Sequence, residues 1–191
     1  MTRAALRVCV LAFVASAGTA SAQDTTDYRV LATNKTATMQ KEMNEAADAG
    51  FQFGGVMGGE TSFGGSEVVV IMSKTALANA RYEYRLLATN KTSTMQKEMQ
   101  EAGDAGFEYK GQSVFKSTFG GKEIVVILER DKEAKAAVAF EYRLLATKKT
   151  STLQKELAEA GAAGYQFVGM TVADTLVGGS EAVAILRRRV K

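Results

Sequence analysis

The sequence contains no histidine, proline or tryptophan and only one cysteine, Cys9. Without histidine there is no Ser–His or Cys–His nucleophile pair, no imidazole base and no imidazole metal ligand. The 24 Lys and Arg residues nearly balance the 21 Asp and Glu residues, which leaves a net charge of +3. Proteins that bind nucleic acid usually carry a large excess of positive charge. Because the excess here is small, we expect no nucleic-acid partner.

The first 22 residues have the pattern of a secretory signal peptide. In order, they contain a basic start, an apolar run and a small-residue cleavage site: Arg3 and Arg7, residues 8–14, and Ala20-Ser21-Ala22. The alternative is a buried or amphipathic N-terminal helix. Cleavage after Ala22 removes Cys9 and leaves no disulfide and no thiolate metal site. We therefore expect a secreted or periplasmic protein that has no transmembrane anchor after cleavage.

The remaining chain repeats one module three times. TNKTATMQKEM begins at Thr33, and it returns as TNKTSTMQKEM at Thr89 and as TKKTSTLQKEL at Thr147. Self-similarity at a fixed offset is the signature of a repeat architecture. The expected organisation is a signal peptide followed by three modules, with these bounds: 1–22, 28–72, 84–128 and 142–186.

Each module predicts the order strand, helix, strand, strand. In the first copy, residues 28–33 are rich in aromatic and β-branched residues, which favours a strand. A helix follows from Thr36, and Gly50 ends it by taking the left-handed conformation. The next strand alternates aromatic residues, and a glycine-rich hairpin leads to the apolar run 68–72. An apolar run of this kind is typical of a strand buried on both faces, so we expect the sheet order first, third, second.

Two local predictions concern the ends of these elements. Ser93 and Gln96 have the spacing of a capping box, and the third copy repeats both residues. The connectors 73–83 and 129–141 are rich in alanine and charge and contain no glycine, which predicts short helices.

The expected fold is α+β. A module of about 45 residues is too small to bury much surface alone, so its uncovered sheet face must pack on the sister modules. We expect three sheets around a pseudo-threefold axis, with the helices outside. The alternative is a string of separate modules, each paired with another chain.

The module resembles a bacterial domain-of-unknown-function family of small β-α-β-β modules. The resemblance lies in Glu-Tyr-Arg-Leu-Leu at 83–87, in the helix end from Ala102 to Phe107 and in the apolar strand 124–128. That family often has tryptophan after the glycine that ends the helix, where this chain has Phe51, Phe107 and Tyr165. The resemblance implies a fold and no catalytic mechanism.

The start of each helix is a candidate anion site, because hydroxyls and an ammonium at a helix N-terminus favour negative charge. The alternative is simple helix capping. The candidate residues are Thr33, Lys35 and Thr36, Thr89, Lys91 and Thr92, and Thr147, Lys149 and Thr150.

These features predict a non-enzymatic, exported structural or binding scaffold with no cofactor, no metal and no catalytic residues. One alternative is a carboxylate hydrolase with Glu67, Glu123 or Glu181 as its base. The other is an envelope protein that forms homo-oligomers through its sheet edges. Arg187–Arg189 form a basic tail, for which a solvated chain end is the usual interpretation.

Overall fold

The structure is a computed structural model that describes residues 25–61, 65–76, 81–116, 122–134, 138–174 and 179–190. The predicted signal segment 1–22 lies outside the described residues, and so do the hairpin glycines Gly64, Gly120, Gly121 and Gly178. Within the described ranges, no helix combines the length and the apolar character needed to cross a membrane.

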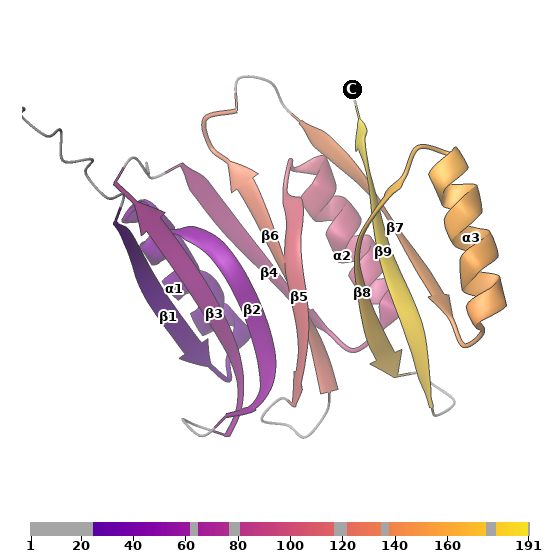
Figure 1. Ribbon diagram of the computed structural model, residues 1–191, viewed down its shortest axis with the longest axis horizontal. Helices are drawn as coiled ribbons and strands as arrows, with labels where there is room; N and C mark the ends of the chain where they lie inside the picture. Colours follow the sequence, from indigo (N-terminus) through magenta and orange to yellow (C-terminus); the bar gives the residue numbers. More distant parts are fainter. Residues whose placement is uncertain are drawn as a thin grey trace, which may run out of the picture.

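The predicted order strand, helix, strand, strand is confirmed in all three modules (Figure 1). The first module contains β1 (Thr26–Thr33), α1 (Thr36–Asp48), β2 (Gln52–Thr61) and β3 (Gly65–Thr75). The second contains β4 (Tyr82–Thr89), α2 (Thr92–Asp104), β5 (Glu108–Lys116) and β6 (Lys122–Asp131). The third contains β7 (Ala139–Thr147), α3 (Thr150–Ala162), β8 (Gln166–Asp174) and β9 (Ser180–Val190).

The predicted sheet order is also confirmed, because the sheets run β1-β3-β2, β4-β6-β5 and β7-β9-β8, all antiparallel. The prediction for the connectors is wrong where they are described. Residues 73–75 and 129–131 continue the central strand, since Thr75 pairs with Thr26 and Asp131 pairs with Tyr82. Backbone pairing with the neighbouring strand outweighs the helix propensity of these residues.

Glycine ends each helix as predicted. Gly50 has a φ of 89°, and the Phe51 N–H donates to Ala46 O at 3.0 Å across it. The capping box is wrong: Lys91 is the N-cap residue of α2 and makes no side-chain cap bond. Gln96 instead accepts a hydrogen bond from the backbone N–H of Leu144, in the next module, at 2.7 Å. The fold brings the backbone of β7 close to Gln96, and Gln96 binds it instead of capping its own helix.

The modules stand in a row rather than around the expected pseudo-threefold axis (Figure 1). One core cluster joins α1 to both neighbouring sheets, through Val70 of the first module and Ile127 of the second. A second cluster joins α2 to the second and third sheets in the same way. The helices α1 and α2 are therefore buried between sheets, because each covers the face that the next sheet leaves open. Of the described helices, α3 alone lies at an end of the row.

The position of a sheet in the row decides how its central strand is buried. Residues 124–128 of β6 are buried on both faces: Val125 and Ile127 share a core cluster with α1, and Ile124, Val126 and Leu128 share one with α2. In β3 the burial alternates, with Val70 and Met72 buried and Ile71 37% exposed. Among the described residues, no helix of another module packs on the outer face of the first sheet.

Candidate functional site

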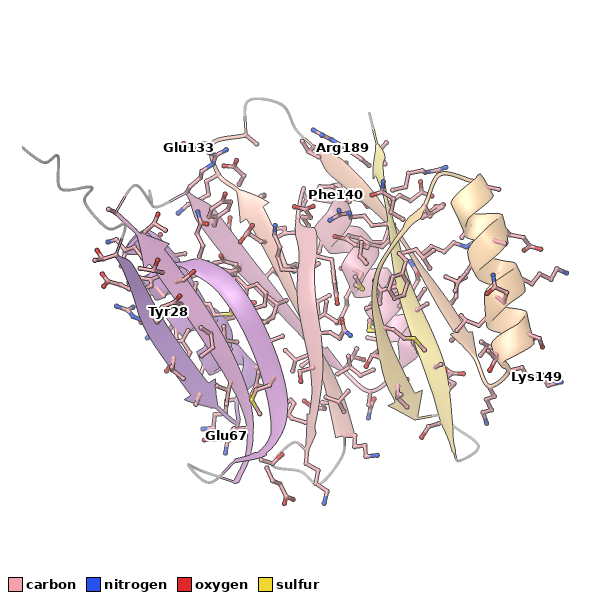
Figure 2. All side chains as sticks on the ribbon, viewed as in Figure 1. Tyr28, Glu67, Glu133, Phe140, Lys149 and Arg189 are labelled. Atoms are coloured by element: carbon pink, nitrogen blue, oxygen red, sulfur yellow. The ribbon has the colours of Figure 1, made fainter. Side chains whose placement is uncertain are left out.

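The predicted anion sites lie at the three helix starts, on one edge of the row (Figures 1 and 2). At each start the first threonine closes a short turn, because its hydroxyl accepts a hydrogen bond from the N–H of the lysine two residues later. The three bonds are Lys35 N to Thr33 Oγ1 at 3.2 Å, Lys91 N to Thr89 Oγ1 at 3.2 Å and Lys149 N to Thr147 Oγ1 at 3.1 Å. The structure leaves the three sites on separate modules, and anion binding there stays a prediction.

The carboxylates suggested for hydrolysis are not brought together. Glu67, Glu123 and Glu181 lie on β3, β6 and β9, each in a different sheet. The Thr92 hydroxyl donates to Glu181 Oε1 at 3.1 Å, which links the second module to the third. In the described part of the chain, no three acidic or cysteine residues cluster as a metal site would require.

A cleft of about 1080 Å³ lies where the second and third modules meet, on the edge opposite to the helix starts. Figure 2 labels Phe140 and Arg189, two of its lining residues, on that edge. The other charged lining residues come from both modules: Glu83, Asp104, Glu108, Lys110, Glu129, Arg130, Asp131, Lys132 and Arg187.

Charged side chains in this cleft form one continuous chain of contacts. The buried Tyr84 hydroxyl donates to Glu129 Oε2 at 2.7 Å. Lys110 Nζ lies 3.0 Å from Glu129 Oε1 and 3.3 Å from Glu108 Oε2. Arg187 of the third module then pairs with Glu108 of the second at 2.5 Å. Positive and negative groups alternate along this chain, so each charge is compensated by its neighbour.

None of these charged residues was predicted as a site residue. The sequence holds one signal that marks them, which is departure from the repeat. Glu129 stands where the other copies have Ser73 and Arg187, and Lys110 stands where they have Gly54 and Val168. Arg187 was assigned to a solvated tail, yet it lies in β9 and is 19% exposed.

Burial and hydrogen bonding change the acidity of the groups between modules. Burial raises the pKa of Tyr84, and its hydrogen bond to Glu129 raises it further. Burial by itself would lower the pKa of Lys110, but the ion pairs with Glu129 and Glu108 outweigh it and raise that pKa. Burial raises the pKa of Tyr109 to about 12.

We expect the free energy of unfolding to fall as the pH rises from 10 to 12. A tyrosine in the unfolded chain loses its proton near pH 10, whereas folded Tyr109 keeps its proton until about pH 12. In this window the folded state binds more protons, so raising the pH favours unfolding. Urea melts at intervals from pH 9 to 12.5, with phenolate absorbance recorded in parallel, measure this. A Tyr109→Phe variant should show a shallower fall, and a stability unchanged to pH 12 would contradict the assignment.

The cleft holds a network of ion pairs and hydrogen bonds that joins the second module to the third. The Tyr84 phenol is protonated at neutral pH, as any tyrosine of ordinary pKa is, and its hydroxyl donates a hydrogen bond to Glu129. Arg187 adds a stacking contact, with its guanidinium carbon 5.1 Å from the centre of the Phe140 ring.

Comparison of the chain with protein-family models, curated proteins and solved structures finds no match.

Proposed function

We propose that this chain is an exported, non-enzymatic scaffold, a stiff row of three modules that bears load or presents binding surfaces. The observation that carries the proposal is that its polar side chains form hydrogen bonds and ion pairs between modules. Polar side chains link the modules to one another: Tyr84 and Gln96, which recur in every copy, and Arg187, which departs from the repeat. Export rests on the signal pattern in residues 1–22.

Repeated inter-module bonds support the stiffness of the row. Asn44 of α1 donates to Tyr84 O and accepts from Tyr84 N, both at 2.9 Å. Gln100 of α2 accepts in the same way from Tyr142 N at 2.9 Å. These amides satisfy the outer edge of the next module's first strand, which would otherwise present unpaired backbone groups. A row joined in this way resists bending at its module boundaries.

The test compares binding with turnover on the purified chain. A thermal-shift screen with polyanions, glycans and envelope fragments is run beside a panel of chromogenic ester, phosphate and glycoside substrates. The scaffold proposal expects no turnover of any substrate. It is overturned if a substrate is hydrolysed and Glu67→Gln, Glu123→Gln or Glu181→Gln abolishes the reaction in a variant that melts like the parent.

A further inference from the structure

The two ends of the row present the two halves of an interface that the chain already contains twice. Inside the row, the helix of one module packs on the first and central strands of the next, and the second strands of the two modules pack on each other. At one end, none of the helices in the described part of the chain covers the outer face of the sheet of β1, β3 and β2. At the other end, β9 is the last described element, so no further sheet among the described residues packs on α3 and β8. Figure 1 shows these two ends on opposite sides of the molecule.

The β1 end exposes apolar side chains, and one of them is a tyrosine whose counterparts in the later modules are buried. Tyr28 is 70% exposed, whereas its counterparts Tyr84 and Tyr142 are 1% and 3% exposed. Val30 and Met57 on the same face are also exposed. Figure 2 shows Tyr28 at this end of the row. Gathered apolar groups of this kind mark an interaction surface.

A glycine on each sheet marks the position where an aromatic ring of the preceding module packs. A Cβ added at Gly111 would lie 3.3 Å from Phe53 Cζ, and one at Gly169 would overlap the Tyr109 side chain. The aromatic ring of one module therefore lies over the glycine of the next. Gly55 is the corresponding glycine of the first sheet, and nothing lies within 4 Å of a Cβ there.

The α3 end carries an aromatic ring, Phe167, that matches the open position at Gly55. Phe167 is the counterpart of Phe53 and Tyr109, and it is exposed together with Met170 and Val172. Leu153 and Leu157 of α3 are only partly buried, whereas the matching methionines of α1 and α2 are completely buried: Met39, Met43, Met95 and Met99. This end thus has an apolar helix face and an aromatic ring without a neighbouring sheet.

We propose that copies of this chain associate head to tail, with the α3 and β8 end of one copy packed on the β1 end of the next. The contact continues the α1–β4 and α2–β7 packing across the boundary between chains. The inference deepens the scaffold proposal and rests on it, since it names a second copy as the partner. Because the two surfaces differ and lie at opposite ends, the association is heterologous and open-ended.

The two ends also match in their backbone hydrogen-bonding groups. Leu86 N and Leu144 N each donate to a glutamine of the preceding helix, Gln40 at 2.8 Å and Gln96 at 2.7 Å. Val30 has the same register in its sheet as Leu86 and Leu144 have in theirs, and Gln154 has the same place in α3. The amide of Gln154 is therefore positioned to accept from Val30 N of the next copy.

The contact between chains is expected to be weaker than the two inside the chain. Ala158 of α3 replaces the clamping amides Asn44 and Gln100. The ion pair between Glu108 and Arg187 has only Gln166 and Ser73 at the equivalent positions. Association that lacks charge pairs should depend little on salt.

Sedimentation of the purified chain over a wide concentration range tests the proposal. We expect the average mass to grow with concentration without a plateau at the dimer, and to change little with salt. Val30→Asp closes the β1 end and Val172→Asp closes the α3 end, so each variant should sediment as a single chain. Both side chains are exposed, so both variants should keep the parental urea midpoint. The matched control is Lys41→Asp on the solvated face of α1, which should associate like the parent.

Mixing the two closed variants gives the decisive readout. Each variant keeps the end that the other has lost, so an equimolar mixture should form pairs and stop there. A parent that stays a single chain at all concentrations overturns the proposal. So does association lost in Val30→Asp but kept in Val172→Asp, which would indicate contact between two β1 ends. Either result leaves the scaffold proposal standing, because the substrate panel tests that separately.

Discussion

Replacing Tyr84 with alanine should lower the free energy of unfolding by about 4 kcal/mol, the usual cost of removing a large buried aromatic side chain. The ring lies in the core cluster between α1 and the second sheet. Its hydroxyl also donates to Glu129 Oε2 and accepts from Phe53 N at 2.8 Å, so truncation removes one hydrogen bond from the Glu129 carboxylate and one from a backbone N–H. Urea unfolding followed by circular dichroism measures the change.

The repeat supplies a matched control for this substitution. Tyr28 has the same place in the first module, but it is 70% exposed and lies outside the core. Tyr28→Ala should change the free energy of unfolding by no more than about 0.5 kcal/mol when measured on dilute protein. Equal losses at the two tyrosines would show that the junction of the first two modules is not where the structure places it.

Replacing Gly103 with alanine should destabilise the protein by about 2 kcal/mol, although alanine favours helix formation. A Cβ at Gly103 would lie 2.2 Å from Phe140 O and 2.9 Å from Tyr142 Cδ2. The backbone oxygen belongs to β7 and cannot rotate away, so α2 must move off the third module. Thermal melts and urea melts both report the loss.

Gly161 is the matched position in α3, and it has nothing within 4 Å of an added Cβ. Gly161→Ala should therefore stabilise the protein by up to about 1 kcal/mol through helix propensity. The two substitutions are chemically identical and are expected to have opposite signs. Stabilisation by Gly103→Ala would contradict the close approach of α2 to β7.

Local chemistry explains why the element order was predictable. The left-handed glycine at Gly50 and its counterparts needs no distant partner, and neither does the apolar run of the central strand. Both signals act within a few residues and recur three times. The capping box failed because Gln96 has a distant competitor, the edge of β7. The charged cleft was not predicted: departure from the repeat marks Glu129, but its contact with Tyr84 joins residues 45 positions apart that meet only across a folded sheet.

The sequence by itself determined the three modules, the order of their strands and helices, and the central place of the third strand. Periodicity and turn residues specify these features, and both are written in short stretches of chain. The tertiary structure decided that the modules stack in a row, that α1 and α2 are buried between sheets, and that Arg187 binds Glu108 instead of ending in solvent. The physical reason is that each sheet must bury a second face, and only the packed neighbours determine which surface covers it.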